Sequence, residues 1–319
     1  MMVLRNCRII ATSILGLLLI FGCNDNRLAP VQTQDQATLA MKPPEHPTKI
    51  VFKSNRDGNL EIYTMNADGT EQTNVTNYAG PDEAPCWSPG GQKIAFISNR
   101  DDEWGLYIQN ADGTGLTCLV PEGEFLPWYP HWSADGEKIV FAGFYDYETP
   151  DQNNEIFVIN VDGTGLTRLT YNPASDGAPC WSPNGRKIAF LSTRDGNSEV
   201  YVMNADGTEQ TNLTNCEEAD DGRPDWSPDG KKIAFDSNRY GRNEIFVMNA
   251  DGSEQICLTD NPARKRRAAW SPCGKMIAFE SYRSGDSEIY VINADGTGQT
   301  QITDNSSNET WVDWVRVDN

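Results

Sequence analysis

The sequence predicts an all-β protein, a six-bladed β-propeller of four-stranded antiparallel blades. One pattern recurs six times along the chain, and each copy holds four short runs of strand-forming residues separated by turn residues. Equivalent residues of successive copies lie 44 to 50 residues apart, a period typical of propellers in which each repeat forms one blade. The residues that mark the copies are Phe52, Phe96, Phe141, Phe190, Phe235 and Phe279, and Trp87, Trp132, Trp181, Trp226, Trp270 and Trp314.

Each copy is expected to supply four strands, which we name A to D. Strand A ends at the repeated tryptophan, and a turn such as residues 227–230 follows, in which proline presets φ and glycine accepts a positive φ. Strand B is the Lys-Ile-Ala-Phe run, and strand C is the Glu-Ile-Tyr-Val run that ends at an Asp-Gly turn such as residues 204–207. Strand D ends in Leu-Thr. The A–B and C–D turns therefore lie on one face of the ring, and the B–C and D–A loops lie on the other.

The two ends of the repeat region predict how the ring closes. The region begins with a B strand at residues 50–52 and finishes with an A strand at residues 311–317. Neither end holds a whole blade. We expect the C-terminal strand to complete the first blade, whose other three strands span residues 49–76, because this closure hides both sheet edges.

Positions that recur in every blade are expected to be structural. The six phenylalanines and six tryptophans should lie in the core, where truncation of one to alanine costs about 3–5 kcal/mol. Charged residues also recur at the ends of strands B and C, and we expect them to form ion pairs across each B–C hairpin: Arg56/Glu61, Arg194/Glu199, Arg239/Glu244 and Arg283/Glu288.

The repeated residues resemble the TolB-type propeller family, a six-bladed relative of the WD-repeat propellers. The resemblance covers residues 48–319 and implies a β-propeller. It also suggests a role in the cell envelope.

The N-terminal segment is expected to be an export signal. Arg5 and Arg8 precede an apolar stretch of 13 residues, 9–21, which is too short to span a bilayer. Residues 20–23 resemble the signal of a bacterial lipoprotein, which implies cleavage before Cys23 and lipidation of its thiol. The alternatives are an ordinary export signal or an uncleaved anchor. We therefore expect a signal at residues 1–22, a lipidated tether at residues 23–47 and a propeller at residues 48–319, facing the periplasm or the cell exterior.

Loop residues that break the repeat are candidate ligand-binding residues. Seven aromatic residues of the second and third blades are expected to converge on the B–C and D–A loop face, beside several acidic residues: Trp104, Phe125, Trp128, Tyr129, Phe144, Tyr145 and Tyr147. Such a patch suits a protein partner or a sugar stacked on rings. The alternative is that these rings only cover the edge of the core.

A basic run forms a second irregularity. Residues 264–267 carry four consecutive cations, of which Arg266 and Arg267 are candidate ligands for an anion near the channel mouth. The alternative, which we favour, is that the run pairs with the neighbouring acidic loop at residues 217–221.

Composition narrows the function. The net charge of −20 opposes binding to nucleic acid and anionic lipid, so contact with the membrane is expected only through the lipid anchor. The chain has two histidines, and no sequence motif of a nucleophile, phosphate or metal site occurs, so we expect no cofactor and no metal. The residues that precede the six tryptophans are the one set that could ligate a metal from around the channel: Asp313, Cys86, His131, Cys180, Asp225 and Ala269.

These observations favour a monomeric, non-catalytic envelope propeller that binds a protein or glycan partner on its variable loop face. The alternative is a carbohydrate-active or hydrolytic enzyme that uses carboxylates at the channel mouth.

A single substitution at Cys23 tests the lipid anchor. Cys23→Ser removes the thiol that would be acylated, so we expect the variant to leave the membrane fraction and to lose metabolic labelling with palmitate. The matched control is Cys7→Ser, which lies inside the expected signal and should remain attached. A Cys23→Ser protein that stays with the membrane would show that the lipoprotein assignment is wrong.

Overall fold

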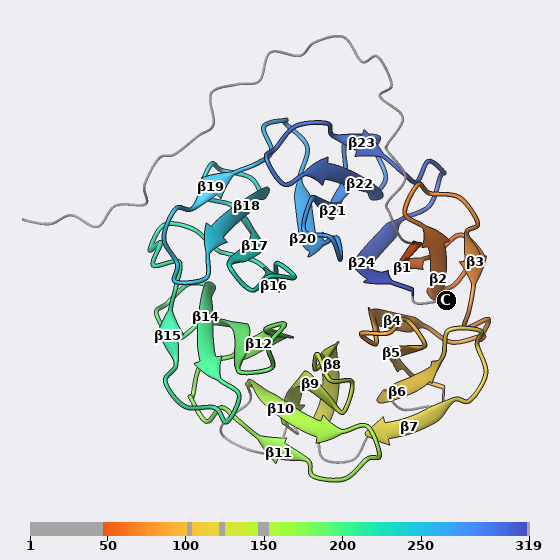
Figure 1. The fold of residues 1–319 in the computed structure, drawn as a ribbon, viewed down its shortest axis with the longest axis horizontal. Helices are drawn as coiled ribbons and strands as arrows, with labels where there is room; N and C mark the ends of the chain where they lie inside the picture. The colour runs from red at the N-terminus through yellow and green to blue at the C-terminus, as the bar shows by residue number, and fades with distance from the viewer. Residues whose placement is uncertain (1–46, 101–103, 121–124, 146–152, 318–319) are drawn as a thin grey trace, which may run out of the picture.

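The computed structural model describes residues 47–100, 104–120, 125–145 and 153–317, and these form a ring of six four-stranded antiparallel sheets around a central channel (Figure 1). The expected six-bladed architecture is confirmed. The expected signal, Cys23 and almost all of the tether lie outside the described residues. Within the described ranges, no helix has the length and apolarity needed to cross a membrane.

The strands of each blade follow one another from the channel outward in the order A, B, C, D. Their bounds are β24 (Glu309–Arg316), β1 (Thr48–Ser54), β2 (Glu61–Asn66) and β3 (Thr73–Asn74) in blade 1; β4 (Asp82–Trp87), β5 (Lys93–Ser98), β6 (Gly105–Asn110) and β7 (Thr117–Val120) in blade 2; β8 (Phe125–Trp132), β9 (Lys138–Tyr145), β10 (Asn154–Asn160) and β11 (Thr167–Arg168) in blade 3; β12 (Asp176–Trp181), β13 (Lys187–Ser192), β14 (Glu199–Asn204) and β15 (Thr211–Asn212) in blade 4; β16 (Asp225–Trp226), β17 (Lys232–Ser237), β18 (Glu244–Asn249) and β19 (Ile256–Cys257) in blade 5; and β20 (Lys265–Trp270), β21 (Met276–Ser281), β22 (Glu288–Asn293) and β23 (Thr300–Gln301) in blade 6.

The core lies between neighbouring blades, where the repeated aromatic residues pack. All six B-strand phenylalanines are fully buried, and each ring lies 5.6 to 6.1 Å from an aromatic ring of strand C in its own blade. The six tryptophans are also buried. The expected turns are present as well, since the Gly230 amide donates to the Ser227 carbonyl at 2.8 Å. The prediction that the repeated residues are structural is confirmed.

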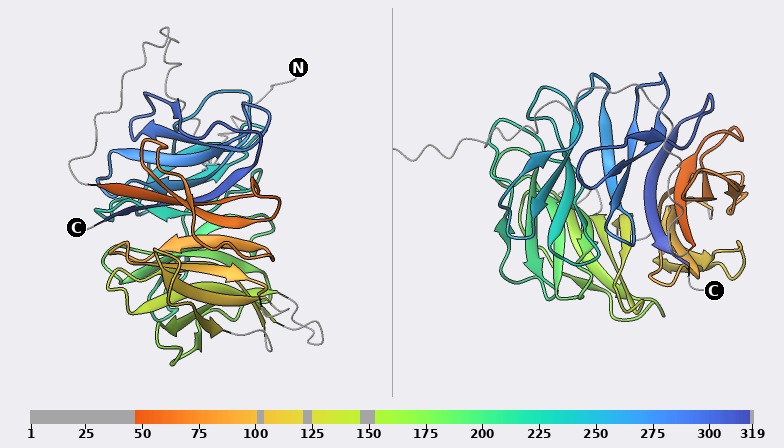
Figure 2. Two further views of the ribbon diagram at one scale, coloured as in Figure 1. Left: turned by 90° about the vertical axis from the view of Figure 1, so that its right-hand side faces the viewer. Right: turned by 45° about the horizontal axis from the view of Figure 1, so that its top comes forward.

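The ring closes as the sequence predicts, because the last strand joins the first blade. β24 pairs antiparallel with β1, with Ile50 opposite Trp314 and Lys49 opposite Val315. Figure 2 shows β24, in dark blue, lying along β1, in orange. One loop contact adds to this closure, where the Asn308 amide donates to Oδ1 of Asn55 at 2.8 Å.

The expected ion pairs across the B–C hairpins are wrong. Arg194 does not pair with Glu199 but donates to Asp176, the first residue of strand A in the same blade, at 3.0 Å. The reason is that its guanidinium stacks 4.6 Å over the Tyr201 ring, which directs it toward strand A. Glu199 instead accepts from the Thr214 hydroxyl of the segment that follows strand D. The same exchange occurs in other blades, in the pairs Arg56–Glu309, Arg100–Asp82 and Arg239–Asp221.

Blade 6 departs from this arrangement because a lysine holds the position of the acid. Lys265 is fully buried and binds Glu244 of blade 5 at 2.7 Å. Arg283, deprived of the acid, donates to Gln299. In blades 1, 2, 4 and 5 a carboxylate at this position pairs with the arginine that follows strand B, whereas in blade 6 the lysine at this position ties the blade to blade 5.

Closure of the ring predicts the effect of a short truncation. Removing residues 311–319 takes away most of β24, and loss of the buried Trp314 alone costs about 3–5 kcal/mol, a large share of the roughly 5–15 kcal/mol that stabilises a typical domain. We expect the shortened protein to lose its cooperative thermal transition in circular dichroism. Removing residues 318 and 319 alone is the control and should leave the transition unchanged. A shortened chain that melts like the full chain would mean that the ring does not depend on β24.

Candidate functional site

The mouth of the channel is lined by the residues three positions before the repeated tryptophans. Going around the ring from blade 1, they are Trp311, Ala84, Tyr129, Ala178, Arg223 and Arg267, and all six line one open cavity of about 100 Å³. Because each A strand runs from a D–A loop toward its tryptophan, this cavity opens on the variable loop face. A volume of this size suits one or two side chains of a partner or a ligand of few atoms.

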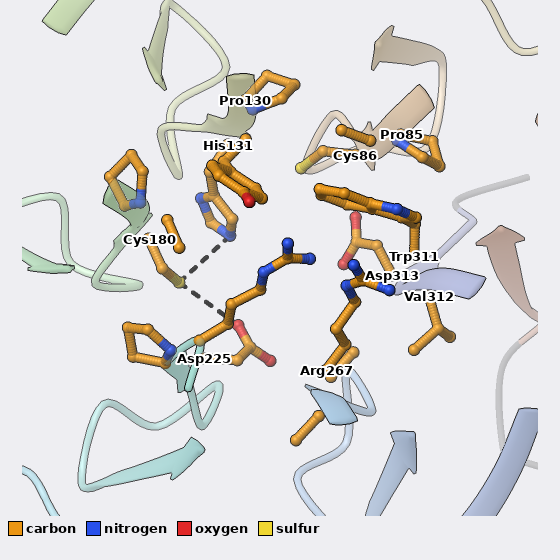
Figure 3. Close-up of a pocket in the computed structure, with 18 residues that line it drawn as sticks. Pro85, Cys86, Pro130, His131, Cys180, Asp225, Arg267, Trp311, Val312 and Asp313 are labelled. Atoms are coloured by element: carbon orange, nitrogen blue, oxygen red, sulfur yellow. Dashed lines mark hydrogen bonds between the residues drawn. The ribbon is translucent and has the colours of Figure 1, made fainter. Parts of the chain in front are cut away.

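A β-bulge turns these residues toward the channel. The A strands slip their register just before the tryptophan, for example between Trp128 and His131, and between Arg266 and Ala269. Tyr129, Arg267 and Trp311 have φ values of 56°, 55° and 61°, a left-handed conformation that is costly for side chains other than glycine. Bulges commonly re-aim a side chain beside a functional site. Figure 3 shows Trp311 and Arg267 pointing into the cavity.

Four large side chains meet at this mouth. The Tyr129 and Trp311 rings stack with their centroids 5.1 Å apart. The Arg223 guanidinium lies 4.2 Å from the Tyr129 ring and 3.9 Å from the Trp311 ring. The Arg267 guanidinium lies 4.3 Å from the centroid of the same Trp311 ring. Both guanidinium groups therefore contact the Trp311 ring, and Arg223 also contacts Tyr129.

The two arginines differ in their partners. Arg267 donates from Nη1 to both carboxylate oxygens of the fully buried Glu280 at 2.8 Å, and the same carboxylate accepts the Trp311 amide at 2.6 Å. Arg223 has ring contacts but no hydrogen bond or ion pair to any residue that the structure describes. Burial lowers the pKa of Arg223 to about 10, so it stays protonated at neutral pH.

An aromatic strip joins the mouth to the rim of blades 2 and 3. The Trp128 ring lies 6.4 Å from Tyr129 and 5.5 Å from Trp104. Trp104, Trp128 and Tyr129 are all partly exposed, and Trp104 also packs against the core. We call Trp104, Trp128, Tyr129 and Trp311 the aromatic strip.

The structure brings together part of the expected aromatic cluster. Phe144 is partly buried on β9 opposite Leu126 and is not part of the strip. Phe125 and Tyr145 face each other in the register of β8 and β9, but their side chains are not described. Tyr147 lies outside the described residues.

The structure places only one of the two expected basic residues at the mouth. Arg267 joins the aromatic strip, whereas Arg266 is not among the residues that line the mouth. The favoured pairing of the basic run with the acidic loop is wrong for the members whose partners are known, since Lys265 binds Glu244 and Arg267 binds Glu280. Within the acidic loop, Asp221 binds Arg239 instead. Glu280 lies on β21, the strand next to β20 in the same sheet, and Glu244 lies on β18 of the neighbouring blade.

Sequence reasoning missed Trp311 and Arg223. Trp311 was assigned only to the closing strand, and Arg223 was not considered. The signal was present, because both occupy the position three residues before a repeated tryptophan, where two other blades carry alanine.

A second ring of side chains lies deeper, one residue before each tryptophan, and three of its members accept a backbone amide of the next blade. Asp313 accepts the Trp87 amide at 2.7 Å, His131 accepts the Trp181 amide at 3.3 Å, and Asp225 accepts the Trp270 amide at 2.7 Å. The thiols that lie between them contact backbone carbonyls of their own strands, Cys86 with Trp87 at 3.6 Å and Cys180 with Trp181 at 3.7 Å. Ala269 supplies no such group, and Asp313 takes the Trp314 amide of its own strand at 2.8 Å.

Part of this ring has the donor atoms of a metal site. His131, Cys180 and Asp225 offer nitrogen, sulfur and oxygen atoms that all lie within 4.8 Å of one another. Because His131 accepts the Trp181 amide at Nδ1, its neutral ring carries a proton on Nε2, which lies 3.4 Å from the Cys180 sulfur (Figure 3). Burial lowers the pKa of His131, which keeps the ring neutral. The three groups thus form a hydrogen-bonded chain rather than a set of free lone pairs.

Burial changes the ionisation of the acids in this ring. It raises the pKa of Asp225 to about 7, and the nearby Asp313 charge adds to the effect. Burial also raises the pKa of Asp313. Carboxyls with raised pKa values are common among catalytic acids, but both of these accept backbone amides of the next blade.

Comparison with known proteins relates this chain to propellers of the TolB type. Residues 37–146, 127–222 and 218–316 match the family model described as the TolB beta propeller domain. A TolB homologue of Chlorobium chlorochromatii is 32% identical over 147 residues, which are 46% of this chain and 32% of that protein. The match thus spans about a third of that relative.

Solved structures share the fold. TolB from Acinetobacter baumannii has a TM-score of 0.73 and 19% identity, covering 84% of this chain and 66% of that one. An oligogalacturonate lyase in complex with manganese has a TM-score of 0.59 and 17% identity, covering 81% and 74% of the two chains. At these identities the likeness concerns the fold alone.

The raised pKa of Asp225 predicts how stability depends on pH. The folded state holds a proton that the unfolded chain releases above about pH 4, so this carboxyl makes stability fall as pH rises from about 4 to about 7. Asp225→Asn keeps an oxygen for the Trp270 amide but cannot ionise. We expect urea unfolding to show a smaller loss of stability across this pH range in Asp225→Asn than in the unmodified protein.

The matched control is Asp286→Asn, which changes an exposed acid of a B–C loop and should keep the original pH dependence. Equal pH profiles for Asp225→Asn and the unmodified protein would show that Asp225 is ionised at acidic pH in the folded state.

Proposed function

Because the chain belongs to the TolB β-propeller family, we propose that it is a non-catalytic, lipid-anchored module of the cell envelope that binds a protein partner on its variable loop face. The protein is exported as a monomer, and the acylated Cys23 alone holds it to the membrane. The propeller then presents its channel mouth at the end of a short tether. A glycan partner is the closest variant of this proposal.

The observation that carries the proposal is the aromatic strip with its two arginines. Aromatic rings and arginine are the residue types that contribute most to binding energy in protein interfaces. Here they form a continuous, partly exposed path from Trp104 at the rim to Trp311 at the mouth. None of the four rings is repeated in every blade, so the symmetry of the propeller does not require them.

A second candidate function is a carbohydrate-active or hydrolytic enzyme. The raised pKa values of Asp225 and Asp313 are the observation in its favour. One fact weighs against it. Both carboxyls line the cavity, but each uses an oxygen to accept a backbone amide of the next blade. The structural role therefore accounts for both residues.

Partner capture tests the binding proposal. We would immobilise the full detergent-solubilised chain, capture ligands from envelope extract, identify them by mass spectrometry and measure the affinity of the purified partner. Trp128→Ala and Tyr129→Ala should each weaken that affinity about tenfold or more, the effect expected of aromatic residues at the centre of an interface. Tyr171→Ala is the control, because this tyrosine is 71% exposed and is not part of the strip.

The outcomes separate the candidates. Equal affinities for all three variants would exclude the aromatic strip as the binding site. Turnover of an envelope polysaccharide that is lost in Asp225→Asn would favour the enzyme instead.

A further inference from the structure

Arg223 is a cation without a direct ion pair in a strongly acidic protein. Other cations around the Trp311 ring each have a carboxylate, since Arg267 binds Glu280 at 2.8 Å and Lys53 binds Glu83 at 3.2 Å. Arg223 forms no ion pair with any residue that the structure describes, and the Glu280 and Asp236 carboxylates act on it only at longer range. The cation of the mouth that has no direct ion pair is therefore Arg223.

The rings hold this guanidinium without using its hydrogen bonds. A cation over the face of an aromatic ring is attracted by the ring electrons, and this contact consumes no N–H group. Arg223 makes the contact twice, with Tyr129 and with Trp311. The side chain is thus ordered in advance, and its five N–H donors stay available to an acceptor.

The arginine reaches this position through a local feature of blade 5. Its A strand is paired only at Asp225 and Trp226, so Arg223 lies outside the regular ladder, next to Pro224. The preceding Gly222 has no room for a Cβ atom, which would come within 2.3 to 2.4 Å of the Asp236 carboxylate. Asp236 is itself engaged by Asn243 at 2.8 Å and by the Arg267 amide at 3.2 Å. This carboxylate therefore packs under the chain at Gly222 and leaves the guanidinium of Arg223 unpaired.

The other residues of the mouth indicate which class of ligand would present an anionic group to Arg223. The walls beside Arg223 are mainly proline, alanine and valine, including Pro85, Pro130, Ala178 and Val312. The deeper acids are occupied by backbone amides and leave few acceptors for the hydroxyl groups of a sugar. An apolar wall with one fixed cation fits a carboxylate on an apolar stem.

We propose that Arg223 is the specificity residue of the mouth and that it binds a glutamate or aspartate side chain in an apolar segment of a partner protein. The guanidinium makes charge-assisted hydrogen bonds to the carboxylate, while the aromatic strip packs against the neighbouring apolar side chains. This inference rests on the proposed binding function and narrows its partner to an acidic peptide segment.

A pair of tripeptides tests the proposal. Acetyl-Leu-Glu-Leu-amide and acetyl-Leu-Gln-Leu-amide differ only in a carboxylate and an amide. Binding to the full chain is followed by NMR through the Trp311 indole N–H, identified by its loss in Trp311→Phe. We expect the glutamate peptide to bind about fivefold or more tightly than the glutamine peptide, with an affinity that falls as salt rises.

Two variants isolate the guanidinium. Arg223→Gln should bind both peptides with the affinity that the unmodified protein has for the glutamine peptide. Arg186→Gln removes the same charge from an exposed position at the A–B turn face and should leave the preference unchanged. Thermal unfolding of Arg223→Gln confirms that the variant is folded before its affinity is compared.

Several results would overturn the proposal. These are equal binding of the two peptides, no saturable binding of either at millimolar concentration, or a preference that survives in Arg223→Gln. Tighter binding of methyl galacturonide, with methyl galactoside as its neutral control, would assign the mouth to an acidic sugar. A partner whose capture needs Trp128 but not Arg223 would leave the proposed function standing and remove the carboxylate site alone.

Discussion

The ring depends on the hydrogen bonds that pass from blade to blade around the channel. In three of the six blades, the residue before the repeated tryptophan accepts the backbone amide of the next tryptophan, and these acceptors are Asp313, His131 and Asp225. These bonds fix how each blade is rotated relative to its neighbour. They also fill the narrow part of the channel with titratable groups whose presence would otherwise suggest catalysis. Their buried positions explain the raised pKa values without any chemistry on a substrate.

A rigid ring of this kind allows variation two residues away. The positions at the mouth differ in side chain, so two blades carry alanine while others carry Tyr129, Arg223, Arg267 or Trp311, and all but Arg223 have a positive φ. Alanine at two of the positions leaves space, and the large residues use it to reach one another across the axis. The backbone supplies the left-handed conformation, and the side chains supply an asymmetric pocket. Function in such a fold resides in the departures from its symmetry.

Much of the fold could be predicted because its signals are local and repeated. Turn residues, strand runs and the position of Trp314 are readable along the chain, and they predict both the blades and the ring closure. Contacts that depend on side-chain direction could not be read in this way. Arg194 appeared to face Glu199 along the hairpin, yet stacking on Tyr201 turns it to Asp176.

The candidate site was predicted in part for the same reason. Tyr129 and Arg267 were expected in separate sectors, because nothing in a non-glycine residue announces the positive φ that turns it inward. Trp311 and Arg223 become visible only when the repeats are aligned and the third residue before each tryptophan is compared. The residues one position before each tryptophan, compared in the sequence, form the deeper ring of the channel instead.

The pairing of β24 with β1 also sets an order of events. Blades 2 to 6 are each built from consecutive residues, so each can assemble from its own stretch of chain. Blade 1 cannot assemble from one stretch of chain, because Ile50 pairs with Trp314 at the far end of the repeat region. The last step of folding is therefore a contact of very high sequence separation, and such contacts form slowly. Until it forms, three strands of blade 1 offer an open edge to other chains, which makes this interval the one in which the protein most needs a chaperone.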